Sequence, residues 1–168
     1  MSDAKSKLKE ARFFMELLEA LETRGDSLTT NSSTREEVSF LLSAILNSFY
    51  SVTEYLKNVI NISEVQNYKK LHPLFYSGKN GLRNITVHER HIEADYIGYI
   101  PPVGKVNLVL GLPPKLVSEI KTPGVVTLRL NPRHYVEVNN RMILIKELCM
   151  DQYQELYKFV NYCYEKSE

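Results

Sequence analysis

The stretch "REEVSFLLSAILNSFYSVTEYL", residues 35–56, decides the fold. Its apolar side chains recur at intervals of three and four residues, which is the period of one face of an α-helix. Either Ser33 with Glu36 or Thr34 with Glu37 supplies a capping box at its start. A helix of about six turns that is apolar along one side must bury that side against other helices. The apolar stripe consists of Val38, Leu41, Leu42, Ile45, Phe49, Val52, Leu56 and Val59.

Helical patterns also occupy most of the chain on either side of this stretch. Residues 3–23 predict a first helix, with Asp3 as its N-cap and Gly25 just past its end. After the quoted stretch, a helical pattern runs to about Leu71, where Pro73 interrupts it. Two further helices are expected, one from about Leu82 to Ala94 and the last from about Lys146 to the end of the chain.

The segment 96–145 has a different character. It holds most of the prolines, and apolar and polar residues alternate in parts of it, which is typical of strands. Asn139 and Asn140 stand between two such runs and suit the tight turn of a hairpin. The expected elements are strands near 96–100, 105–110, 125–130, 134–138 and 141–145, and a short helix at 112–121.

The predicted fold class is therefore mainly α. We expect a bundle of four to five helices, formed by residues 3–95 and 146–166, with a small strand-rich insertion, residues 96–145, before the last helix. The whole chain of 168 residues is expected to form a single domain, because the last helix completes the helical core.

Composition, charge and cysteine content indicate which class of protein the chain belongs to. The chain is 43% apolar and 24% charged, as in ordinary globular proteins, and its net charge of +1 is too small to attract nucleic acid by overall field. Cys149 and Cys163 lie too far apart on one predicted helix to pair, and are expected to be buried thiols. The sequence shows no signal peptide, membrane span or Cys/His metal cluster, so we expect a cytoplasmic protein without metal or cofactor.

The segment "GLRNITVHER", residues 81–90, contains the residues that suit chemistry. The imidazole of His88 titrates near neutrality and can act as general base or acid. The guanidinium of Arg83 is a permanent planar cation that binds phosphate through two parallel hydrogen bonds. Asn84 lies one helical turn before His88 and can orient either the imidazole or a phosphate. This set of residues predicts metal-independent cleavage of RNA.

The spacing of this motif raises a geometric difficulty. Arg83 and His88 are about 140° apart on a straight helix. Either the helix starts at or after Arg83, which leaves its side chain room to move, or a second copy of the chain completes the site across a two-fold axis. A second copy would also supply the separate acid and base that the reaction needs.

The stretch "LRNITVHE", preceded by the long apolar helix 35–56, resembles the signature of the HEPN superfamily. The resemblance covers about residues 5–95. It implies a helical bundle that dimerises and cleaves RNA without a metal, as the toxin of a toxin–antitoxin pair or as a defence effector. It also implies that Arg83, Asn84 and His88 are the catalytic residues. One departure is Arg90, where toxins of one common branch of the superfamily have tyrosine.

Neighbouring polar residues are candidates for substrate contact. His91 lies one turn beyond His88, and Lys79 and Arg90 add positive charge near the motif. The expected partners are RNA, a second copy of the chain and an antitoxin or another protein encoded by a neighbouring gene.

Two other readings stay open for the motif: a non-catalytic HEPN-like module that binds RNA, a nucleotide or a protein, and a purely structural role. The remaining basic residues are expected to be structural. Lys69 and Lys70 are read as a solvated face, His72 as a helix-end residue and His134 as remote from the site.

Overall fold

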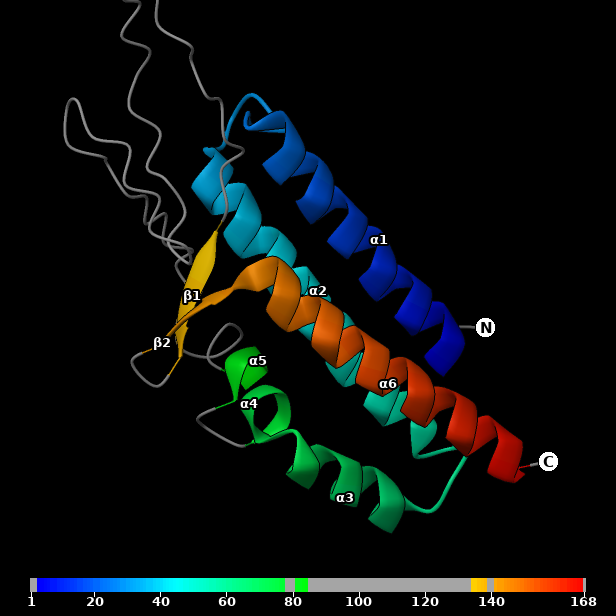
Figure 1. Cartoon of the computed structure of the whole chain (residues 1–168). Helices are drawn as coiled ribbons and strands as arrows, with labels where there is room; N and C mark the ends of the chain where they lie inside the picture. The colour runs from blue at the N-terminus through cyan, green and yellow to red at the C-terminus, as the bar shows by residue number, and fades with distance from the viewer. Residues whose placement is uncertain (1–2, 78–80, 85–133, 139–140, 168) are drawn as a thin grey trace, which may run out of the picture.

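The computed structural model describes residues 3–77, 81–84, 134–138 and 141–167. Within these ranges the chain is mainly helical with a two-stranded sheet, which confirms the predicted fold class at this level. The three long helices lie side by side, and the short helices follow one another along one side of them (Figure 1). The elements are α1 (Ala4–Arg24), α2 (Thr34–Leu56), α3 (Ile62–Leu71), α4 (Pro73–Tyr76), α5 (Leu82–Asn84), β1 (Tyr135–Val138), β2 (Arg141–Leu144) and α6 (Ile145–Ser167).

Helix α2 begins with one of the two predicted capping boxes. The Ser33 hydroxyl accepts a hydrogen bond from the backbone N–H of Glu36 at 3.3 Å, and the backbone N–H of Ser33 donates to the Glu36 carboxylate at 2.8 Å. These bonds satisfy two N–H groups that have no partner within the helix. Most of the predicted apolar stripe is fully buried: Val38, Leu42, Ile45, Phe49, Val52 and Leu56.

The end of α2 differs from the prediction. The apolar repeat predicts a helix that reaches Val59, but α2 ends at Leu56. Beyond this point the backbone N–H groups of Asn58 and Val59 donate to carbonyls three residues back, at 3.1 and 2.9 Å. Such bonds wind the chain more tightly than an α-helix does. Val59 is therefore still packed against the core, although it lies outside the helix.

Both predicted ends of α1 are confirmed. The Asp3 carboxylate accepts a hydrogen bond from the backbone N–H of Ser6 at 2.7 Å. At the other end Gly25 has a φ of 74°, and its N–H donates to the carbonyl of Leu21 at 3.0 Å. This left-handed conformation is open to glycine at little cost. It turns the chain back, so that α1 and α2 run antiparallel (Figure 1).

The loop between α1 and α2 is organised around the carboxylate of Glu37. It accepts hydrogen bonds from the backbone N–H groups of Leu28 and Thr29 at 2.6 and 2.7 Å, and from the hydroxyls of Thr29 and Ser32 at 2.6 and 3.0 Å. Burial by itself would raise the pKa of Glu37, but these hydrogen bonds outweigh it and lower the pKa to about 2. The ionised carboxylate is therefore the form that stabilises the loop.

We expect the stability of the protein to depend on Glu37 in acid. Because the folded-state pKa lies below the ordinary value of 4.5, the contribution of Glu37 is fully present above pH 4.5 and is lost as the pH falls toward 2. In urea unfolding over this window, Glu37→Gln should reduce the pH dependence of the free energy of unfolding. Hydrogen bonds from Ser33 also lower the pKa of Glu36, one position earlier, so Glu36→Gln is the comparison and should reduce the pH dependence less. An unchanged pH dependence in Glu37→Gln would contradict the prediction.

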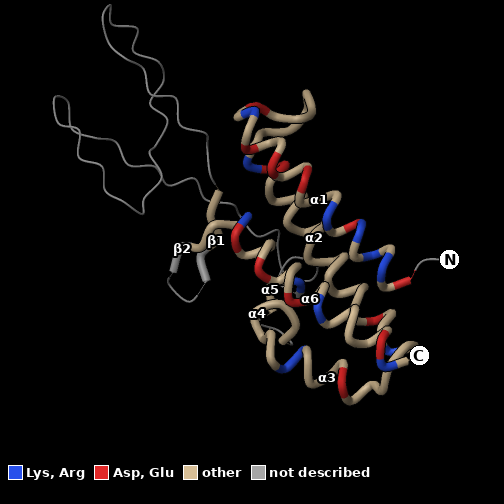
Figure 2. The backbone as a smooth tube through the Cα atoms, turned by 45° about the vertical axis from the view of Figure 1, so that its right-hand side comes forward, with Lys and Arg blue, Asp and Glu red and all other residues tan. Residues whose placement is uncertain are grey.

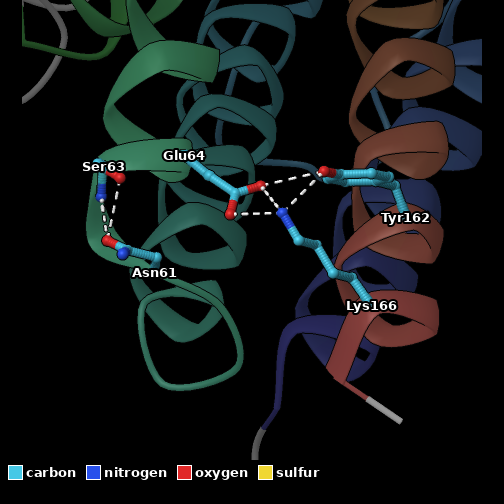
Figure 3. Close-up of polar contacts among 5 residues, drawn as sticks. All are labelled: Asn61, Ser63, Glu64, Tyr162 and Lys166. Atoms are coloured by element: carbon cyan, nitrogen blue, oxygen red, sulfur yellow. Dashed lines mark hydrogen bonds and ion pairs between the residues drawn. The ribbon is translucent and has the colours of Figure 1, made fainter.

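Polar and aromatic side-chain contacts join helix α3 to the C-terminal half of α6. The Lys166 ammonium lies 2.8 and 3.0 Å from the two carboxylate oxygens of Glu64, and the Tyr162 hydroxyl donates to Glu64 at 3.1 Å (Figure 3). Deeper in the interface, the rings of Tyr68 and Phe159 stack with their centres 4.2 Å apart. The last helix therefore packs back on the bundle, as the sequence predicts.

The predicted hairpin before the last helix is confirmed. β1 and β2 are antiparallel, with Tyr135 opposite Leu144 and Val138 opposite Arg141. The second strand ends at Leu144, and α6 follows without a connecting loop. The backbone N–H of Ile145, the first residue of α6, donates to the carbonyl of His134 at 3.0 Å, which joins the hairpin to the start of the helix.

Several predicted elements lie outside the described residues. They are the helix beyond Asn84, the Asn139–Asn140 turn, the strands at 96–100, 105–110 and 125–130, and the short helix at 112–121.

Both cysteines are buried free thiols, as predicted. Burial raises the pKa of Cys149 to about 12 and that of Cys163 to about 11, so neither is ionised at neutral pH. Among the helices of the described ranges, none is long and apolar enough to span a bilayer. Lys and Arg are interspersed with Asp and Glu along α1 and α6 (Figure 2). Attraction of an anion therefore requires a local cluster of cations.

Candidate functional site

Arg83 is carried by α5, whose position is fixed by tight packing. Leu82 is buried in the helical core. The backbone N–H of Gly81 donates to the carbonyl of Ser77 at 2.5 Å, and a Cβ atom on Gly81 would collide with that same carbonyl oxygen. Only glycine fits at such a close backbone approach. The start of α5 is therefore held at one place beside α2.

The Arg83 side chain lies against a polar face of α2. Its guanidinium carbon is 4.2 Å from the centre of the Tyr50 ring, and its Nε donates to the Asn47 side-chain oxygen at 3.4 Å. Asn47 and Tyr50 are three residues apart, so they share one face of the helix. A guanidinium stacked on a tyrosine ring gains roughly 0.5–2 kcal/mol, more when water is excluded.

A second cation lies against the same tyrosine. The Lys69 ammonium, from α3, is 4.3 Å from the centre of the Tyr50 ring. The ammonium also lies 2.7 Å from a carboxylate oxygen of Glu54, and the Lys69 side chain is only 11% exposed. The Lys69 ammonium and the Arg83 guanidinium are therefore separated by at most the sum of their two distances to the ring centre. The sequence-based prediction of a solvated face is wrong for Lys69, because its side chain packs against Tyr50 and pairs with Glu54.

These residues form a group that we call the Tyr50 cluster. Glu54 also pairs with Lys57 at 2.6 Å. Burial by itself would raise the pKa of Glu54, but hydrogen bonds from Lys57 and Lys69 and the charges of both lysines lower it, so the carboxylate is ionised at neutral pH. Among the described residues, Glu54 is thus paired with two of the three cations of this group, Lys57 and Lys69. The members are Asn47, Tyr50, Glu54, Lys57, Lys69 and Arg83.

No protein-family model, characterised protein or solved structure matches this chain. The HEPN resemblance therefore stays a prediction that depends on the signature residues of the sequence.

Of the predicted catalytic residues, the structure describes the arginine and its neighbour. Arg83 is a member of the Tyr50 cluster, and Asn84 follows it as the last residue of α5. His88 lies outside the described residues. The predicted substrate-binding residues, Lys79, Arg90 and His91, lie outside them as well.

Two other histidines are described, and both have structural roles. His72 stands between α3 and α4 with its ring centre 4.4 Å from that of Tyr68, which confirms the prediction of a helix-end residue. Burial lowers the pKa of His72. His134 is buried, and its backbone N–H donates to the Glu22 carboxylate of α1 at 3.0 Å. His134 therefore anchors the hairpin to the end of α1.

The residues of α2 that hold Arg83 were not predicted from the sequence. The prediction for this helix rested on its apolar stripe. Asn47, Tyr50, Glu54 and Lys57 also recur at intervals of three and four, so they form a polar stripe on the same helix. That stripe was the available signal that a polar partner would pack there.

A separate hollow of about 330 Å³ lies between α1 and α6. Its lining includes Cys149, and its charged residues are paired, with Arg12 bound to Glu16 at 2.9 Å and Lys146 to Glu19 at 2.6 Å. Because these charges are paired and the thiol is not ionised, this hollow is poorly suited to an anionic substrate.

Proposed function

We propose that this protein is a metal-independent endoribonuclease of the HEPN type that acts as a homodimer. The observation that carries the proposal is the setting of Arg83. The signature arginine lies over the Tyr50 ring, is hydrogen-bonded to Asn47 and shares the ring with the Lys69 ammonium. A guanidinium fixed in this way suits the binding of a phosphodiester, because charge-assisted hydrogen bonds to phosphate are strong and directional.

The proposed reaction needs a base, an acid and a stabilising cation. His88 takes the proton from a ribose 2′-hydroxyl, and the 2′-oxygen forms a bond to the adjacent phosphorus. The bond from phosphorus to the 5′-oxygen breaks, and that oxygen receives a proton from an imidazolium, for which the partner subunit's His88 is the candidate. Arg83 neutralises the charge that builds up on the non-bridging oxygens. The products are a 2′,3′-cyclic phosphate and a 5′-hydroxyl.

The remaining signature residues have supporting roles in this proposal. Asn84 orients the imidazole or the phosphate through its amide. Lys79, Arg90 and His91 contact the RNA backbone on either side of the cleaved bond. The cellular role that goes with this activity is that of a toxin or defence effector, held inactive by an antitoxin or another partner protein.

A second candidate function is a HEPN-like module that binds RNA, a nucleotide or a protein without cleaving anything. The Tyr50 cluster also supports this candidate, since a fixed pair of cations on an aromatic ring binds an anion whether or not a base is at hand. The two candidates differ in turnover, which makes them separable in one assay.

The experiment is the incubation of purified protein with end-labelled single-stranded RNA in excess EDTA. The proposal predicts cleavage that continues in EDTA and leaves 2′,3′-cyclic phosphate and 5′-hydroxyl ends. A requirement for added Mg²⁺, or other end groups, would contradict the ribonuclease proposal. RNA that is retained by the protein but stays intact would favour the binding module.

A further inference from the structure

Tyr50 is in contact with two cations that repel each other. The Arg83 guanidinium and the Lys69 ammonium lie 4.2 and 4.3 Å from the centre of its ring. The negative face of an aromatic ring attracts each cation, which offsets part of their mutual repulsion. Lys69 has a carboxylate partner as well, Glu54 at 2.7 Å. The ring is therefore an element shared by the two charges of the cluster.

The binding of phosphate by arginine depends on the orientation of the guanidinium. Its parallel N–H groups match two phosphate oxygens only in one plane, and an unrestrained arginine loses side-chain entropy when it adopts that plane. Contact with the face of the Tyr50 ring and the bond from Nε to Asn47 restrict Arg83 before any ligand arrives. Preorganisation of this kind lowers the cost of binding.

We propose that Tyr50 is a positioning residue of the RNA site, which holds the Arg83 guanidinium in the plane that receives the phosphodiester. The inference rests on the proposed function and adds a residue that the signature does not contain. Tyr50 acts through Arg83 and does not itself touch the RNA. Its contribution to RNA binding therefore depends on the presence of Arg83.

A double-mutant cycle on RNA binding tests this dependence. The titrations use the His88→Ala protein, so that cleavage does not interfere, and single-stranded RNA over a range of salt concentrations. The slope of the logarithm of the RNA-binding constant against the logarithm of the salt concentration is negative. Arg83→Ala should make it less negative by about 0.7, the value for one phosphate contact on a single strand. Tyr50→Leu should weaken binding about two- to thirtyfold, and Tyr50→Phe, which keeps the ring, should bind as the parent does.

The decisive comparison is Tyr50→Leu in the Arg83→Ala background. If Tyr50 acts through Arg83, the double variant binds RNA no more weakly than Arg83→Ala alone. A further loss of the same size as in the parent would overturn the inference, and so would an Arg83→Ala protein that binds RNA normally. Both results are independent of cleavage, so a failure of the ribonuclease proposal in the EDTA assay remains distinguishable.

Two further variants distinguish a role of Tyr50 in positioning Arg83 from a general loss of folding in Tyr50→Leu. Tyr164→Leu removes a similar contact elsewhere, because the Lys5 ammonium lies 4.2 Å from the Tyr164 ring, and it should leave RNA binding unchanged. Asn47→Ala removes a different restraint on Arg83 with little change in the core, and it should show the same dependence on Arg83 if Tyr50→Leu does not fold. Asn47→Ala that weakens binding equally with and without Arg83 would also overturn the inference.

Discussion

Replacement of His88 by alanine should slow RNA cleavage by about 10²- to 10⁴-fold, the usual contribution of a general acid or base. The loss should fall on kcat, since the Tyr50 cluster still binds the phosphodiester. Because the proposed base and acid are the His88 side chains of the two subunits, the wild-type pH–rate profile should be bell-shaped, and this shape should disappear in the variant. Single-turnover cleavage in EDTA across a pH series measures both effects.

His72→Ala is the matched control for this experiment. His72 is a described histidine with a structural setting, and its ring packs at a tilt against that of Tyr68 at the junction of α3 and α4. We expect its replacement to affect stability more than cleavage, so rates are compared well below the unfolding temperature of each protein. Equal losses of cleavage in the two variants would mean that His88 contributes through folding, and the catalytic role would be withdrawn.

Local signals account for what the sequence predicted well. The caps of α1 and α2 depend on side chains within three residues of the helix end, and Gly25 stands where a left-handed residue is needed. The hairpin depends on two short runs that face each other across two residues. Each of these features involves near neighbours in the chain, and their chemistry is therefore visible in a short window of sequence.

The features that sequence reasoning missed join residues far apart in the chain. Arg83 reaches Asn47 across 36 positions, and the backbone of His134 reaches Glu22 across 112. The helical period shows that Tyr50 and Asn47 share a face, but not which segment packs on that face. The signature predicted Arg83 as a phosphate binder, whereas the ring and the second cation beside it follow from the packing of α3 and α5 against α2.

Replacement of Phe49 by alanine should lower the free energy of unfolding by about 3–5 kcal/mol, the usual cost of removing a buried phenylalanine. Phe49 is 0% exposed in the middle of α2, and its ring centre lies 6.2 Å from that of Phe75 in an edge-to-face contact. The lost side chain would leave a cavity that the long helices cannot close without moving. Since domains of this kind have only about 5–15 kcal/mol of stability, the loss is large. Urea unfolding followed by far-UV circular dichroism measures it.

Phe40→Ala is the control on the same helix, because Phe40 is 49% exposed and should cost clearly less. Similar losses in the two variants would contradict the packing described for α2. The same two variants also test whether packing in the core supports the Tyr50 cluster. Phe75 belongs to α4, and Ser77 is the C-cap of that helix. The carbonyl of Ser77 accepts the hydrogen bond from Gly81, two residues before Arg83. A Phe49→Ala protein that is still folded should therefore bind RNA more weakly than Phe40→Ala, because the loosened α4 no longer fixes the start of α5 and with it the guanidinium on Tyr50.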